Sequence, residues 1–185
     1  MGCDIHMWLM GKHSNDLGYT EITLYDNEGK KVGFPYFRHY DTFGTLCEGV
    51  RSMGVLKNNH PRRGRFKYAV EKYKDQKIVY KDYDEAFLAP STILNYVHDT
   101  YKVGDEEKPT FLHSHTWIEI RELEKMVKKL RKLKDKDTDG NILATYHCVK
   151  NILKYAKNAI WMMNMQFFET SYNEEFSVIL IAFDN

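Results

Sequence analysis

The chain has 185 residues, of which 43% are hydrophobic and 29% charged, with 27 Lys and Arg against 26 Asp and Glu. This composition is typical of a globular protein and excludes a disordered chain, and the length fits a single domain over residues 1–185. The near-zero net charge argues against a general nucleic-acid partner, because polyanion binding would then need a local basic patch.

The sequence contains three widely spaced cysteines, no Cys-x-x-Cys pair and no secretory or transmembrane stretch. Disulfide-stabilised secreted domains usually show an even number of cysteines, and membrane spans need about 20 apolar residues. We therefore expect a reduced, cytoplasmic protein with no membrane partner.

Alternation of apolar and polar residues predicts three antiparallel strands near the N-terminus. The first covers residues 3–12 and the second residues 19–25, and a turn over 27–30 leads to a third strand over 32–37. Alternate side chains of a strand share a face. The first strand would carry Ile5, Met7 and Leu9 on one face and Asp4, His6 and Trp8 on the other.

The middle of the chain gives weaker patterns. The spacing of Phe43, Leu46 and Val50 predicts a helix over 41–53, followed by a loop over 54–67. The stretch 68–108 is ambiguous, with a strand expected near 78–80 and a helix around 92–101.

The last third of the chain is the most regular. Apolar residues at helical spacing predict one helix from Ile120 and a second after Gly140, and their short connection indicates an antiparallel hairpin. Residues 176–183 form an apolar run typical of a buried strand. The predicted fold is α+β: an N-terminal antiparallel β-meander, a C-terminal helical hairpin and a final strand joining the sheet.

Two short segments carry side chains that bind metals or transfer protons. They contain Asp4 and His6, and His113 and His115. In extended strands each pair would share a face, and a pocket would form if the segments met. All four would then be ligands for a metal such as Zn or Mn, or His6, His113 and His115 would act as catalytic acids and bases on a phosphoester. The alternative is that Asp4 caps or forms a salt bridge and the histidines are structural.

A second candidate site surrounds the predicted helix over 41–53. Arg38 and Arg51 would bind phosphate or carboxylate, and aromatic neighbours would stack on a base. The aromatic candidates are Trp8, Tyr40, Phe43 and Trp117. The alternative is that the arginines pair with local acids and the aromatic side chains belong to the core.

The basic stretch 57–65, which includes Arg63, would clamp an anionic ligand or serve solubility alone. The lysines and arginines over 125–134 are interpreted as a solvated helix face. Residues 135–142 match the start of an EF-hand calcium loop, but Tyr146 stands where the twelfth-position carboxylate is required. A charged connection between two helices is therefore favoured.

Five motifs together resemble a family of mostly uncharacterised bacteriophage and prophage proteins. They are Met1–His6; Arg38, Tyr40, Phe43, Val50 and Arg51; Pro61, Arg63 and Gly64; His113, Ser114, His115 and Trp117; and Phe183–Asn185. This chain departs from the family pattern at Thr116 and at Glu119, which leaves the start of the following helix between 116 and 120. The resemblance implies a phage origin and a host-cell cytoplasmic location, and it implies no reaction.

Three functions remain open. The first is binding of a small anionic, nucleotide-like ligand in a pocket of His, Arg and aromatic residues, as an anti-defence protein that sequesters or degrades a host signal. The second is a metal-dependent phosphoester hydrolase. The third is a protein-binding inhibitor of a host enzyme, in which the histidines are structural. Whether the protein is an enzyme and whether it is a homo-oligomer are left open.

Overall fold

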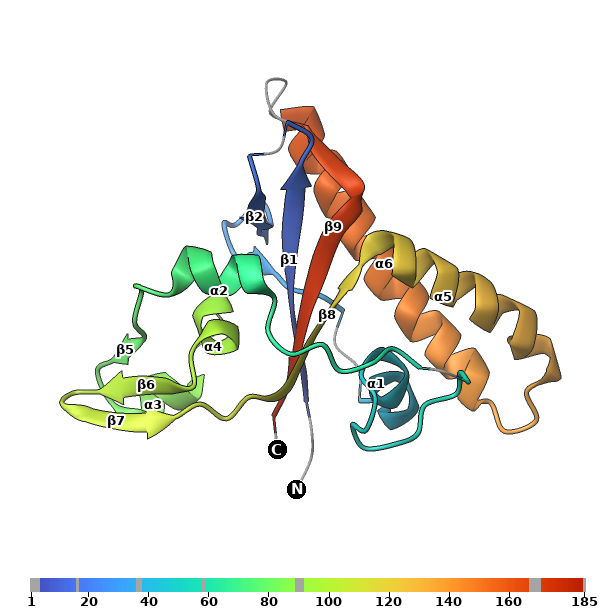
Figure 1. The fold of residues 1–185 in the computed structure, drawn as a ribbon, viewed down its shortest axis with the longest axis horizontal. Coiled ribbons are helices and arrows are strands. Elements are labelled where there is room, and N and C mark those ends of the chain that lie inside the picture. The colour runs from blue at the N-terminus through green and yellow to red at the C-terminus, as the bar shows by residue number, and fades with distance from the viewer. Residues whose placement is uncertain are drawn as a thin grey trace.

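The computed structural model describes residues 4–15, 17–35, 38–57, 59–88, 92–166 and 171–184. Its centre is an antiparallel sheet of four strands in the order β2-β1-β9-β8 (Figure 1). These strands are β1 (Ile5–His13), β2 (Tyr19–Ile22), β8 (His113–Glu119) and β9 (Tyr172–Phe183). The last strand lies inside the sheet, between the first strand and β8. The α+β class and the final strand joining the sheet are confirmed.

Helices cover both faces of this sheet (Figure 1). One face packs against α1 (Tyr40–Leu46) and the predicted helical hairpin, α5 (Ile120–Leu133) and α6 (Asn141–Gln166). The other face packs against α2 (Lys67–Tyr73) and α4 (Ile93–Val97). No helix within the described ranges is both long enough and apolar enough to span a bilayer.

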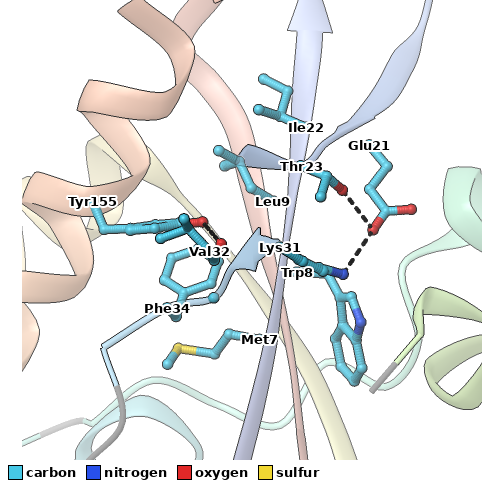
Figure 2. A pocket seen from close by; sticks show the side chains of 11 residues that line it. Met7, Trp8, Leu9, Glu21, Ile22, Thr23, Lys31, Val32, Phe34 and Tyr155 are labelled. Atoms are coloured by element: carbon cyan, nitrogen blue, oxygen red, sulfur yellow. Dashed lines mark hydrogen bonds and ion pairs between the residues drawn. The ribbon is translucent and has the colours of Figure 1, made fainter. Parts of the chain in front are cut away.

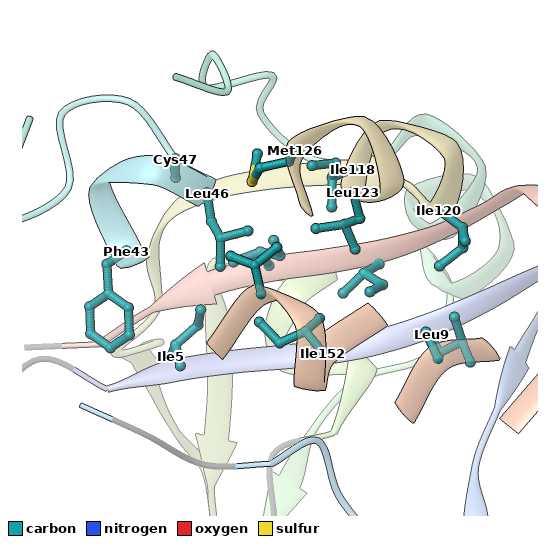
Figure 3. Packing of buried hydrophobic residues seen from close by; sticks show 14 of the residues in the cluster. Ile5, Leu9, Phe43, Leu46, Cys47, Ile118, Ile120, Leu123, Met126 and Ile152 are labelled. Carbon is teal, nitrogen blue, oxygen red and sulfur yellow. The ribbon is translucent and has the colours of Figure 1, made fainter. Parts of the chain in front are cut away.

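The sheet is buried on both sides because its two central strands carry apolar side chains on both faces. In β1, Ile5 and Leu9 join the cluster beneath the helical hairpin, shown in Figure 3, whereas Trp8 and Met10 join the cluster beneath α2 and α4. In β9, every side chain from 178 to 183 is fully buried. The predicted buried strand is confirmed, and it begins earlier than expected, at Tyr172.

The predicted third strand does not extend this sheet. Residues Leu24–Tyr25 (β3) and Lys31–Val32 (β4) instead form a separate two-stranded ribbon around the predicted turn. Pro35 has no backbone N–H to donate to a ladder, which explains why pairing ends early. Residues 36 and 37 of the expected strand lie outside the described residues, as do Met1–Cys3 and Asn185 of the terminal motifs.

The helix predicted over 41–53 is shorter than expected. It ends at Leu46, and the left-handed backbone of Gly49 (φ 78°) and Arg51 (φ 60°) is incompatible with its continuation. Arg51 therefore lies on the irregular segment after α1.

The ambiguous stretch 68–108 contains most of α2, all of α4 and a small lobe beside them. Its strands are β5 (Val79–Tyr80), β6 (Thr100–Val103) and β7 (Glu106–Pro109), with helix α3 (Tyr83–Leu88) between the first two. The strand predicted near 78–80 is confirmed. The helix predicted around 92–101 ends at Val97, because residues from Thr100 onward pair in β6.

The start of α5 is set by a capping box. The Glu119 side chain accepts from the backbone of Glu122, and the Glu122 side chain accepts from the backbone N–H of Glu119 at 3.0 Å. These bonds satisfy N–H groups that have no partner within the helix. The departure at Glu119 thus still provides a helix cap, and the helix begins at Ile120.

Candidate functional site

The two histidine-bearing segments flank the same end of β9. Ile5 of β1 and His113 of β8 are both register partners of Phe183. Neighbouring strands are about 4.8 Å apart, so the two segments lie about 10 Å from each other with β9 between them. They share one end of the sheet but are not adjacent strands.

A β-bulge at Ser114 separates the two histidines of β8. His113 is paired with Phe183 and Thr116 with Ile181, so the bulge inserts one extra residue, and Ser114 has a left-handed φ of 54°. Because register partners share a face, His113 lies on the face of Phe183, whereas His115 contacts Tyr96 on the opposite face. The predicted shared face of His113 and His115 is therefore wrong.

His6 belongs to a polar cluster at this end of the sheet. Its Nε2–H donates to Oδ2 of Asp184 at 3.0 Å, while Oδ1 of Asp184 accepts from the backbone N–H of Asp4 at 2.7 Å. Arg38 Nε donates to Oδ1 of Asp4 at 2.6 Å. Among the described residues, the cluster combines two carboxylates with one guanidinium and one imidazole, so these side chains offer no excess of positive charge to an anion.

His115 has a separate environment. Its ring lies edge-on to Tyr96, with the centroids 5.3 Å apart, and its Nε2 accepts from Arg65 Nη2 at 3.5 Å. Burial and the adjacent guanidinium lower the pKa of His115 to about 4. His115 is therefore neutral at physiological pH and packs, half-buried, against Tyr96 of α4.

The four predicted metal ligands do not form one group. His113 Nδ1 is bonded to Ser114 Oγ at 2.7 Å, and its Nε2 is buried without a hydrogen-bond partner in the described part of the chain. Across the described ranges, no three His, Cys, Asp or Glu side chains lie close enough together to hold a metal ion. The bulge and the intervening strand divide Asp4 and His6 from His113 and His115, and the same separation applies to the three predicted catalytic histidines.

Two predicted stacking residues belong to the core. Trp8 is 3% exposed and packs on Tyr96, and Phe43 is fully buried against Phe183. Neither ring is accessible to a ligand, so their assignment as ligand-binding residues is wrong. Tyr40 is 43% exposed at the start of α1, and Arg51 is exposed on the segment that follows this helix.

A cavity of about 240 Å³ lies between α5 and the segment 59–63. We call it the groove. Its polar lining consists of Asn59, His60, Arg63, Glu122, Lys125 and Lys129, and its apolar lining includes Leu56, Ile118 and Met126. Of the predicted site residues, the groove contains Arg63.

Arg63 is held rigidly at the rim of the groove. Its Nη1 and Nη2 donate to the two carboxylate oxygens of Glu122 at 2.9 and 2.5 Å. The guanidinium lies 4.5 Å from the ring centroid of Trp117, and the Arg63 backbone N–H donates to Thr116 Oγ1 at 3.2 Å. The carboxylate and the ring hold the planar guanidinium, and the Thr116 contact holds the backbone, so the group is well ordered for binding. Trp117 therefore supports Arg63.

His60 also holds the segment 59–63 in place along the groove. Its Nε2–H donates to the carbonyl of Trp117 at 2.7 Å, and its backbone bonds to Thr45 and Glu48. Burial lowers the pKa of His60, and the carbonyl partner sets the proton on Nε2. The ring is therefore neutral, with Nδ1 as a hydrogen-bond acceptor.

The groove has a surplus of positive charge. Burial of the Glu122 carboxyl raises its pKa, but the hydrogen bonds from Arg63 and from the Glu119 backbone outweigh this effect and lower the pKa overall. Glu122 is thus ionised and neutralises Arg63. Lys125 and Lys129 are exposed one helical turn apart, and neither forms an ion pair within the described residues. Their two charges are left for a ligand.

A second cavity, bounded by β1, β2 and the β3–β4 ribbon, is shown in Figure 2. Its volume is about 20 Å³, which is space for one water molecule. Its rim is closed by the Tyr155 hydroxyl, which donates to the carbonyl of Val32 at 2.5 Å. This cavity is too small for a ligand, which leaves the groove as the better candidate.

The chain matches no protein-family model, and no curated protein or solved structure is significantly similar to it. The assignment of candidate functional residues therefore rests on the geometry of this chain, in which the groove combines a cavity with positive charge.

Proposed function

We propose that this protein binds a small anionic, nucleotide-like ligand in the groove. The observation that carries the proposal is the pair Lys125 and Lys129, which lie without ion-pair partners in the described chain beside the fixed guanidinium of Arg63. Hydrogen bonds between ammonium groups and phosphate oxygens are charge-assisted and stronger than neutral ones. A phosphate group is the chemistry that satisfies both lysines at once.

The groove suits an anion better than the histidine cluster does. At the sheet end, the carboxylates of Asp4 and Asp184 lie beside His6 and would repel a phosphate. In the groove the single carboxylate, Glu122, is already neutralised by Arg63. The proposed ligand is that of the sequence-based hypothesis, at a site that contains Arg63 but none of the predicted histidines.

The nucleotide-like part of the proposal rests on Arg63. Its guanidinium lies over the ring of Trp117, and an arginine guanidinium is the kind of plane on which nucleobases stack. The apolar side chains of Leu56 and Met126 provide further contact area. A volume of about 240 Å³ is slightly below the usual range for ligand pockets, which favours a mononucleotide over a larger ligand.

The motif resemblance implies a phage setting. In that setting binding alone would serve as an anti-defence function, because capture would remove a host signal from solution. His60 contributes a neutral acceptor, with its proton already donated to Trp117. The groove residues thus support capture of the ligand.

The test is a thermal-shift and calorimetric comparison of AMP, cyclic AMP, ADP-ribose and inorganic phosphate, with adenosine as the uncharged control. We expect binding of the phosphate-bearing compounds and none of adenosine. Each lost charge-assisted bond costs about 1.5–3 kcal/mol, so K125A/K129A is expected to weaken binding by about tenfold or more.

The matched control is K128A/K132A, which removes two exposed lysines of the same helix that do not line the groove. This variant is expected to bind like the unaltered protein. Flat responses to all four compounds would contradict the proposal, and so would an equal loss in both double variants.

A further inference from the structure

Charge is strongly segregated along this molecule although the chain is almost neutral. Residues 120–136, which contain α5, have eight Lys and Arg against three Asp and Glu, a net charge of +5 in a chain of net charge +1. Residues 74–112, which contain the β5-β6-β7 lobe, have five Lys and Arg against eight Asp and Glu, a net charge of −3. The two regions lie at opposite ends of the longest axis (Figure 1). One end of the molecule is therefore basic and the other acidic.

The basic end carries a continuous ridge of lysines. Positions 125, 128, 129 and 132 are spaced three and four residues apart, so their side chains project from one side of α5. The ridge consists of Lys125, Lys128, Lys129 and Lys132. All four are exposed, and none has an ion pair within the described residues.

The acidic residues of α5 do not interrupt the ridge. Glu122 is paired with Arg63, and Glu124 accepts from Lys157 of α6 at 2.5 Å. Lys157 also pairs with Glu174, so each of the two α5 carboxylates has a cationic partner on a flank of the helix, and Glu124 shares its partner. A ridge of four lysines without an opposing acid is a surface for a polyanion.

The dimensions and side chains of the ridge favour a nucleic-acid duplex. Lys125 and Lys132 are about 10 Å apart along the helix, and a duplex carries one charge for each ~1.7 Å of its axis, so several phosphates lie within reach. Single strands are held by stacking on aromatic rings, but the described parts of α5 and of the segment 59–65 expose none. A membrane surface requires an exposed apolar helix face, whereas Leu123, Met126 and Leu130 are buried in the core.

We propose that the lysine ridge of α5 docks on the phosphate backbone of duplex nucleic acid, without reading the bases. The groove ligand and the duplex use overlapping but not identical sets of residues. Lys128 and Lys132 lie outside the groove, while Lys125 and Lys129 belong to both surfaces. The acidic lobe at the far end would orient the molecule so that α5 faces the duplex.

The test is fluorescence anisotropy with a labelled 24-base-pair DNA duplex of arbitrary sequence, between 50 and 200 mM salt. Four or five phosphate contacts predict that the logarithm of the affinity falls with the logarithm of the salt concentration with a slope of about −4. The variant K128E/K132E is expected to bind about tenfold or more weakly, and its slope is expected to be less steep by about 2. K128Q/K132Q is expected to be intermediate.

The matched control is K77E/K102E, which makes the same change in net charge with two exposed lysines of the acidic lobe. It is expected to bind the duplex within about twofold of the unaltered protein. Equal losses in the two charge-reversal variants would overturn the proposal, because net charge alone would explain them. Because Lys77, Lys102, Lys128 and Lys132 are exposed, we expect every variant to fold. A thermal unfolding curve for each variant checks this.

Two further probes separate the duplex from other polyanions. Tighter binding of a 24-nucleotide oligo-dT than of the duplex would overturn the proposal in favour of a single strand. Binding to phosphatidylserine vesicles without binding to the duplex would overturn it in favour of a lipid surface. Duplex binding by K128E/K132E at the unaltered level would also overturn it. Failure of the small-ligand proposal has a different signature, a flat response to nucleotides with duplex binding intact.

Discussion

The carboxylate of Glu122 accepts hydrogen bonds from both terminal nitrogens of Arg63, at 2.5 and 2.9 Å. These bonds connect the rim of the groove to the first turn of α5. The same carboxylate accepts from the backbone N–H of Glu119. One side chain therefore caps the helix, neutralises an arginine and positions the guanidinium over Trp117. Stability and the proposed binding site depend on the same contact.

Substitution of Glu122 is expected to separate its two roles. Gln keeps an oxygen for the Glu119 N–H but removes the ion pair with Arg63, so E122Q is expected to lower the free energy of unfolding by about 1 kcal/mol. E122A loses the cap as well and is expected to cost about 2 kcal/mol. Urea unfolding at pH 7 measures both values. Equal stability of E122A and the unaltered protein would contradict the structural role of this contact.

The His115 imidazole is expected to make the protein less stable in mild acid. Burial lowers its pKa from 6.5 to about 4, so between these pH values the unfolded chain binds a proton that the native protein does not. The contribution of His115 to the free energy of unfolding is therefore at its maximum above pH 6.5 and is lost as the pH decreases toward 4. After allowance for screening by solvent, the loss is about 2 kcal/mol.

The control is H115Q, because Gln has no proton to bind in this pH range. Urea unfolding at pH 7 and at pH 4.5 gives the loss of unfolding free energy in acid for each protein. We expect this loss to be smaller by about 2 kcal/mol in H115Q than in the unaltered protein. The same acid loss in both proteins would show that another group carries it.

The long regular elements were predictable because their patterns are repeated many times. Strand β1, the α5–α6 hairpin and the buried part of β9 follow from an apolar pattern that continues along most of each element. The short elements were not predictable. The helix after Tyr40 ends at Leu46 because Cys47 is extended, and the left-handed backbone of Gly49 and Arg51 keeps the helix from resuming. The β3–β4 ribbon has only two residues in each strand.

The candidate site was only partly predictable. Arg63 was found by its charge and loop position, but Lys125 and Lys129 look like any solvated lysines until a cavity is seen beside them. The bulge at Ser114 moves His115 away from the face of His113, and no residue type in this segment predicts a bulge. The Glu122–Glu119 capping box was the one sequence signal that would have placed a carboxylate beside the groove.

The backbone of α1 approaches the segment after Gly49 so closely that only glycine fits at position 44. A Cβ there would collide with the carbonyl oxygen of Ser52 and with the backbone N–H of Gly54. G44A is therefore expected to destabilise the protein by about 2 kcal/mol, although alanine favours helices. Asn59, which lines the groove, donates to the Gly44 carbonyl, so the groove is expected to shift as well.

The control for this substitution is G33A. Gly33 has no heavy atom within 4 Å of the added Cβ and no positive φ. Urea unfolding of the two variants is expected to show a loss for G44A alone. A G44A variant as stable as G33A would mean that the Ser52 segment relaxes without cost.

Asp184 is expected to lock the start of β1 onto the end of β9. Its Oδ1 accepts the backbone N–H of Asp4 and its Oδ2 accepts from His6, while its own backbone N–H donates to the carbonyl of Asp4. Removing the carboxylate leaves the Asp4 N–H without this acceptor, at a cost of about 1–2 kcal/mol in local stability. D184A is therefore expected to speed hydrogen exchange of the Asp4 amide by about tenfold.

D184N is expected to have a smaller effect, because the amide oxygen still accepts from Asp4. D75A, at an exposed position in the acidic lobe, serves as the control and is expected to leave this amide unchanged. Unaltered exchange in D184A would show that the strand ladder alone holds the two chain ends together.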